Sequence, residues 1–174
     1  MNKLLADFVN VSILFKKIDF IPDANSTLRL TYGHVKGYTP VDATYMKPTT
    51  TLTGLIEKGT REGDYYLPDY IRELYKKKDF GPWLTKDKKD VPLAFLYDMD
   101  TTGGNSGSPI MDENGNLVGV NFDRAFEATI NDFAWNESYS RSIGCDIRYV
   151  LWVAQKVDKA DNVINELGLK DWVK

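Results

Sequence analysis

Alternating and apolar segments along the chain predict a body of β-strands. Residues 27–32 alternate polar and apolar side chains, which is the period of a half-buried strand. β-Branched residues at 49–53 favour another strand, and the apolar run at 91–97 favours a buried one. A further short strand is expected at 142–145.

A β-hairpin is the clearest local prediction. Two apolar runs, 108–111 and 117–122, flank the pair Asn114-Gly115. Asn-Gly between apolar runs is a strong hairpin signal, because both residues accept the positive φ angles of a tight turn.

Helices are expected at both ends of the chain and once between strands. Residues 1–17 favour a helix, and Pro68 stands where another would begin. Asp146 can cap a helix whose apolar side chains recur every three to four residues as far as position 157. Asp161 begins a last short helix that Gly168 stops.

Composition narrows the class of protein. The 174 residues suffice for one domain with a core, and the net charge of −3 argues against a nucleic-acid surface. No segment is apolar enough to span a membrane, and Asp7 interrupts the apolar stretch at 4–15, which therefore does not resemble a signal peptide. The basic run 76–78 is interpreted as a solvated helix end. Cys145 is the single cysteine and is expected to be a buried, small apolar residue.

The segment from Gly104 to Pro109 reads Gly-Asn-Ser-Gly-Ser-Pro and carries the candidate chemistry. A serine nucleophile needs an exposed hydroxyl on a tight turn and backbone N–H groups that face the developing oxyanion. Ser106 would be that nucleophile, and the N–H groups of Gly104 and Ser106 would form the oxyanion hole. Gly107 would let a substrate approach closely. The alternative is a glycine-rich structural turn. Serine hydrolysis requires neither metal nor cofactor, and none is expected.

A serine nucleophile also needs a general base, and His34 is the only histidine. In a double-barrel peptidase the histidine and aspartate come from the first barrel. A chain of this length cannot hold two barrels together with the predicted helices. We therefore expect His34 to be a strand-end residue and not the base.

Four segments resemble the bacterial serine exopeptidase family that contains dipeptidyl-peptidases 7 and 11. They occur in order along the chain, which makes the resemblance extensive and specific. They are Pro22–Gly33, Thr102–Pro109, Asn121–Asp123 and Asp146–Leu151.

The resemblance implies a mostly β fold, namely the second β-barrel of a chymotrypsin-like double-barrel serine peptidase, with C-terminal helices. Residues 1–17 would be a helical tail or linker, and 18–174 the C-terminal barrel of a longer protein. The missing N-terminal half would supply the histidine and aspartate of the triad, so the isolated chain should be inactive. Family members act on peptides with a free N-terminus in the periplasm, often as homodimers.

Two residues after the predicted strand at 117–122 acquire roles from this resemblance. Asp123 would hold the α-amino group of the substrate, which makes the enzyme release dipeptides. Arg124, expected to begin a loop, would lie in the S1 pocket and select Asp or Glu before the scissile bond. Their alternative interpretations are a solvated aspartate and a surface arginine paired with an acidic neighbour.

Two other functions remain open at this level. A glutamyl endopeptidase can share the serine motif but would cleave N-terminally blocked peptides. A non-catalytic binding module could keep the fold and would not react with a fluorophosphonate.

Overall fold

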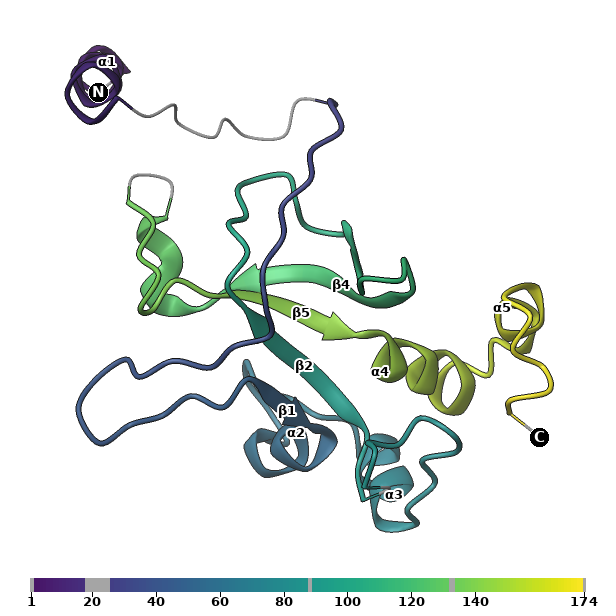
Figure 1. Cartoon of the computed structure of the whole chain (residues 1–174). Coiled ribbons are helices and arrows are strands. Elements are labelled where there is room, and N and C mark those ends of the chain that lie inside the picture. Colours follow the sequence, from purple (N-terminus) through teal and green to yellow (C-terminus); the bar gives the residue numbers. More distant parts are fainter. Residues whose placement is uncertain (1, 18–25, 88, 132–133, 174) are drawn as a thin grey trace.

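The structure is a computed structural model that describes residues 2–17, 26–87, 89–131 and 134–173. Figure 1 shows the strands and helices of the described residues. In order they are α1 (Asn2–Lys16), β1 (Thr49–Thr51), α2 (Leu52–Lys58), α3 (Asp69–Lys76), β2 (Pro92–Tyr97), β3 (Pro109–Met111), β4 (Leu117–Arg124), the 3-10 helix η1 (Phe126–Ile130), β5 (Ser142–Asp146), α4 (Ile147–Trp152), the π-helical η2 (Val153–Val157) and α5 (Asp161–Glu166).

The strands form one antiparallel sheet in the order β1-β2-β5-β4-β3. The sheet is open, and the described residues do not form the predicted barrel. Closing a sheet requires its two edge strands to pair. Here the edges are β1 and β3, which have three residues each and lie at opposite sides of the sheet.

The strand predicted at residues 27–32 is wrong. Residues 27–32 form no strand, and in Figure 1 the dark blue chain after the uncertain segment runs toward the sheet as a coil. Leu28, Leu30 and Tyr32 are almost fully exposed, so their alternation is not matched by a buried face. The first pairing with the sheet comes at Val35, which bridges to Tyr97 of β2. Alternation leads to a strand only where a neighbouring strand pairs with the segment, and no strand of the described residues pairs with 27–32.

The predicted hairpin is confirmed as β3 and β4, with Ile110 opposite Gly119. Asp112 organises the turn, because its carboxylate accepts the backbone N–H groups of Asn114 and Asn116, each at 2.9 Å. The strands predicted at 91–97 and 142–145 are also present, as β2 and β5.

The helices at the C-terminal end form the largest core with α2 and α3. The Asp146 carboxylate caps α4 by accepting the Arg148 N–H at 2.9 Å, as predicted. Trp152 is fully buried there, among the side chains of Leu52, Leu67, Ile71, Phe80, Trp83, Val91 and Ile164. Apolar burial among these helices and loops therefore holds α4, which follows directly after β5.

α1 confirms the helix predicted for the N-terminal residues. In Figure 1 it lies apart from the sheet, and its side chains Leu4, Leu14 and Phe15 are at least three-quarters exposed. The proposed boundary between a linker and a barrel, at residue 18, lies outside the described residues. So do residues 22–25, the start of the first segment that carries the family resemblance. Among the described helices, none combines the length and apolarity needed to cross a membrane.

Candidate active site

The serine motif forms a tight loop between β2 and β3. Ser106 is exposed, and it stands between Gly104 and Gly107, whose φ angles are +87° and +86°. These are left-handed backbone conformations that a side chain disfavours, which explains glycine at both positions. The structure therefore presents the serine hydroxyl on a sharp turn at the surface.

Asn105 ties the loop together from within. Its side-chain oxygen accepts the Thr102 N–H at 2.8 Å, and its backbone N–H donates to the Thr102 carbonyl at 3.1 Å. Its own carbonyl accepts the Ser108 N–H at 3.0 Å. The residue before the candidate nucleophile thus bonds to both sides of the turn.

β4 holds the other side of this loop through Asn121. The Asn121 carbonyl accepts the Gly107 N–H at 2.9 Å, and the Asn121 N–H donates to the Ser108 carbonyl at 2.8 Å. The Ser106 hydroxyl lies 3.4 Å from the carbonyl oxygen of Phe122. The pairing of β4 with β5 shifts between Asn121 and Asp123, which leaves Phe122 as a bulge beside the serine. Bulges of this kind commonly re-aim side chains next to active sites.

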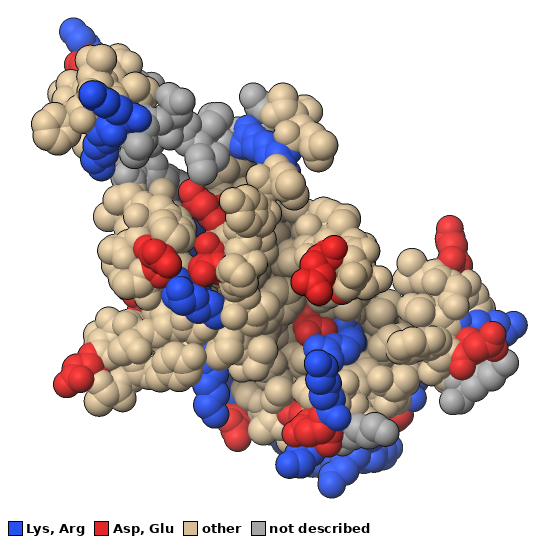
Figure 2. Space-filling view, in the orientation of Figure 1, with Lys and Arg blue, Asp and Glu red and all other residues tan. Residues whose placement is uncertain are grey.

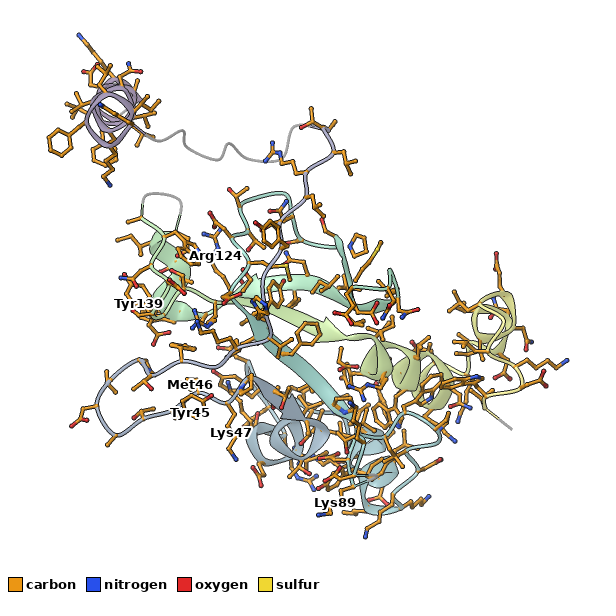
Figure 3. The ribbon with its side chains drawn as sticks, in the orientation of Figure 1. Tyr45, Met46, Lys47, Lys89, Arg124 and Tyr139 are labelled. Carbon is orange, nitrogen blue, oxygen red and sulfur yellow. The ribbon has the colours of Figure 1, made fainter. Side chains whose placement is uncertain are left out.

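Asp123 and Arg124 follow the bulge on the same strand. Asp123 is exposed, and its carboxylate accepts the Arg124 N–H at 2.8 Å. Arg124 is half-buried and pairs with Ser142 of β5, so it is the last residue of β4 and does not begin a loop, as the sequence suggested. Figure 3 labels Arg124 at the end of β4, close to η1. The two candidate substrate-binding residues are therefore two and three positions beyond the residue that anchors the serine loop.

His34 is exposed and takes part in this region through its backbone. Its N–H donates to the Asp98 carboxylate at 2.6 Å, and its carbonyl accepts the Asp98 N–H at 3.1 Å. Lys36 lies 3.7 Å from the same carboxylate. These contacts attach the chain to the end of β2, which is consistent with a strand-end role.

Two buried polar contacts near the serine loop were not predicted from the sequence. The hydroxyls of Thr101 and Ser142 are 2.6 Å apart, and Ser142 also donates to the Met99 carbonyl at 3.0 Å. Tyr97 donates its hydroxyl to the side-chain oxygen of Asn121. Burial raises the pKa of Tyr97, so this hydroxyl remains a donor. Of these residues, only Ser142 and Asn121 carried a signal in the sequence, as polar residues within predicted strands.

A separate apolar pocket of about 290 Å³ opens on the sheet beside β1. Met46 and Lys47, which Figure 3 labels, belong to its wall. The pocket contains none of Ser106, Asp123 or Arg124 among its lining residues, so we do not assign it to the serine site. Its lining is Tyr38, Met46, Lys47, Pro48, Thr49, Thr50, Ala94, Phe95, Leu96, Ala125 and Ile143.

Charge is mixed around these features. On the face shown in Figure 2, acidic and basic side chains both occur, and uncharged residues cover much of the surface between them. Among the described residues, no group of three or more His, Cys, Asp or Glu side chains is placed to hold a metal ion. Cys145 is half-buried, and burial raises the pKa of its thiol.

Serine hydrolases display their nucleophile on a tight turn, and Ser106 stands exposed on such a turn, between two left-handed glycines and bonded to an antiparallel sheet. The chain belongs to the Peptidase S46 family, whose family model matches residues 1–169.

Named relatives and a solved structure are also similar to this chain. The chain is 47% identical over 158 residues to the Asp/Glu-specific dipeptidyl-peptidase of Flavobacterium psychrophilum, which covers 90% of this chain and 22% of that protein. It is 42% identical over 149 residues to dipeptidyl-peptidase 7 of Phocaeicola vulgatus, covering 85% and 20%. The crystal structure of Porphyromonas endodontalis DPP11 with the dipeptide Arg-Asp matches at 38% identity with a TM-score of 0.80, covering 90% and 22%. The chain thus spans about a fifth of the length of these relatives.

Proposed function

We propose that this chain is the C-terminal part of a serine exopeptidase that releases dipeptides from peptides with a free N-terminus. The observation that carries the proposal is the loop of Ser106, which displays the serine hydroxyl and is hydrogen-bonded to the strand that continues into Asp123 and Arg124. The proposed nucleophile therefore lies on a loop bonded to the strand that carries the proposed carboxylate and guanidinium.

Ser106 attacks the scissile carbonyl, and the N–H groups of Gly104 and Ser106 stabilise the oxyanion that forms. The left-handed conformation of Gly104 supports this role, because it turns the peptide out of the ordinary strand direction. The base and its orienting acid come from the missing N-terminal half, which is the principal partner of this chain. The complete catalytic unit is a chymotrypsin-like double barrel, in which the open sheet described above is the core of the second barrel.

Asp123 binds the α-amino group of the substrate, and Arg124 binds an Asp or Glu side chain before the scissile bond. A carboxylate facing an ammonium and a guanidinium facing a carboxylate are charge-assisted hydrogen bonds, among the stronger polar contacts. Arg124 can form such a bond in bidentate geometry, which favours acidic over neutral side chains. Two relatives named for Asp/Glu specificity, from Flavobacterium psychrophilum and Capnocytophaga gingivalis, are 47% and 49% identical to the chain and support this assignment.

The test is the full-length protein with fluorogenic arylamides of Leu-Asp and Leu-Glu. We expect release of the dipeptide, no cleavage of the same peptides with a blocked N-terminus, and loss of activity in Ser106→Ala. Cleavage of blocked peptides would favour a glutamyl endopeptidase instead. Absence of both hydrolysis and fluorophosphonate labelling would favour a binding module.

We further propose that the full-length protein acts in the periplasm as a homodimer. Both properties come from the family resemblance. Cell fractionation beside a periplasmic marker enzyme tests the location, and light scattering of the purified protein tests the dimer.

A further inference from the structure

We propose that Tyr97 is a positioning residue for the loop of Ser106, acting through Asn121. This inference rests on the proposed role of Ser106 as nucleophile. Tyr97 does not contact the serine itself. Its hydroxyl holds the residue of β4 to which the serine loop is bonded.

Tyr97 is the last residue of β2 and is 1% exposed. Its ring packs against Phe95, with ring centroids 5.7 Å apart, and belongs to the same buried cluster as Ile110. Packing therefore fixes the ring, and with it the position of the hydroxyl. The hydroxyl donates to the side-chain oxygen of Asn121.

This hydrogen bond reaches across a whole strand, because β5 lies between β2 and β4 in the sheet. The β5 residue opposite Asn121 is Gly144, which has no side chain to block the path. An added Cβ at Gly144 would lie 2.5 Å from a side-chain carbon of Ile110 and 2.9 Å from the ring of Phe95. The space beside Gly144 of β5 is thus filled by side chains from β2 and β3.

Asn121 is the point at which the serine loop joins the sheet. Its carbonyl accepts the N–H of Gly107, the residue after the serine, and its N–H donates to the carbonyl of Ser108. The next carbonyl along β4, that of Phe122, lies 3.4 Å from the Ser106 hydroxyl. A rotation of Asn121 would therefore move both the backbone and the hydroxyl contact of the nucleophile.

The hydrogen bond from Tyr97 is hard to replace because both Tyr97 and Asn121 are buried away from solvent. Asn121 is 7% exposed, so its side-chain oxygen has little access to solvent as a substitute donor. A phenylalanine at position 97 would keep the packing of the ring and remove only the hydrogen bond. The strand would then be free to shift toward another partner, and small displacements of reacting groups reduce catalysis strongly.

The experiment compares Tyr97→Phe with Tyr75→Phe in the full-length protein. Tyr75 is a matched control, because its hydroxyl bonds to Thr53 at 2.7 Å within the helical core. For hydrolysis of a Leu-Asp arylamide we expect Tyr97→Phe to lower kcat about tenfold with KM within about twofold. Tyr75→Phe should leave kcat and KM unchanged, even if both variants lower the unfolding temperature.

Asn121→Ala is the second variant, which keeps the inference testable if Tyr97→Phe fails to fold. It removes the acceptor and should lower kcat to a similar extent. The double variant should be no slower than either single variant, since both remove one interaction.

Unchanged kcat in an active Tyr97→Phe enzyme, or a rise in KM alone, would overturn this inference and leave the proposed function intact. Additive losses in the double variant would overturn it as well. A wild-type protein that neither hydrolyses the arylamide nor labels with a fluorophosphonate would overturn both.

Discussion

Arg124 lies directly opposite Ser142 in the antiparallel pairing of β4 and β5. The buried hydroxyl of Ser142 also bonds to Thr101 and to the Met99 carbonyl, in the segment that leads into the serine loop. A single residue of β5 therefore fixes both the strand end that carries the guanidinium and the approach to the nucleophile. This connection makes the relative position of Ser106 and Arg124 a property of the sheet.

Arg124→Gly in the full-length protein should change substrate preference. A guanidinium carries its charge at any working pH and binds a carboxylate in bidentate geometry, a contact that a neutral side chain cannot make. We expect kcat/KM for a Leu-Asp arylamide to fall at least about tenfold, which is about 1.4 kcal/mol of transition-state stabilisation. Activity on a Leu-Leu arylamide should rise relative to it. An unchanged ratio between the two substrates would show that Arg124 does not set the preference.

The isolated chain of 174 residues should not hydrolyse dipeptidyl arylamides. Removing the general base from a serine protease lowers kcat by about 10⁶-fold, and in the proposed function the base comes from the N-terminal half of the longer protein. Activity should return when the N-terminal half is co-expressed. Turnover by the isolated chain that disappears in His34→Ala would contradict the prediction and make His34 the base.

Gly107→Ala should lower both stability and activity, whereas Gly63→Ala should lower stability alone. The φ angles are +86° and +78°, and an added Cβ would meet open space at both positions. Backbone strain of about 1–2 kcal/mol is thus expected for each. Only Gly107 bonds to β4 beside the serine, so only its variant should lose kcat, by at least about tenfold. Urea denaturation and arylamide hydrolysis of the full-length protein measure the two effects. Equal activity in both variants would argue against a role for the loop conformation.

Trp152→Ala should destabilise the chain by about 3–5 kcal/mol, because it empties the centre of the helical core. Trp152 is fully buried, and its indole N–H donates to the Asp79 carbonyl at 3.0 Å. Trp172 is 68% exposed and provides the control, with an expected loss of less than about 0.5 kcal/mol. The measurement is the urea midpoint of each variant. Similar midpoints would mean that the helices do not share one core.

Stability should fall in alkaline solution, partly because of Tyr38. Burial and a hydrogen bond to Glu127 at 2.5 Å raise the pKa of Tyr38 to about 12 from 10.0. The folded protein then keeps a proton that the unfolded chain releases near pH 10. The free energy of unfolding therefore falls as the pH rises from about 10 to about 12.

Tyr38→Phe should make this decline shallower without abolishing it, because burial also raises the pKa of Tyr97 and Tyr149. Urea midpoints measured across the alkaline range test the effect, and the exposed Tyr66 provides the control as Tyr66→Phe. An identical slope for Tyr38→Phe and wild type would contradict the assignment.

The sequence alone determined the turns and the helix cap, because these depend on residues that are adjacent in the chain. The Asn-Gly pair at 114–115 predicted its hairpin because the turn and the flanking runs are adjacent in the chain. Asp146 predicted the start of α4 because a cap bonds to a backbone group two residues away. The glycines around Ser106 indicated an unusual turn for the same reason, and both have the positive φ angles expected of such a loop.

What the sequence could not determine were features that depend on distant partners. The alternation at 27–32 had the period of a strand, yet this segment has no strand beside it in the described fold and its apolar side chains remain exposed. Arg124 was expected in a loop and lies in β4, because its pairing with Ser142 extends the strand beyond the bulge. Strand pairing is a contact between segments, and composition alone does not specify which segments meet.

The contacts that hold the loop of Ser106 also divide into those that the sequence indicates and those that only the fold creates. The sequence identified Ser106 and its glycines by residue type and spacing alone. Only the tertiary structure brings Tyr97 to Asn121 and Thr101 to Ser142, pairs that are 24 and 41 residues apart along the chain. A tyrosine in an apolar run resembles any other core residue until the fold gives its hydroxyl an acceptor. The positioning role inferred for Tyr97 follows from burial. Water cannot replace its hydroxyl as a partner of Asn121, so this one hydrogen bond holds β4.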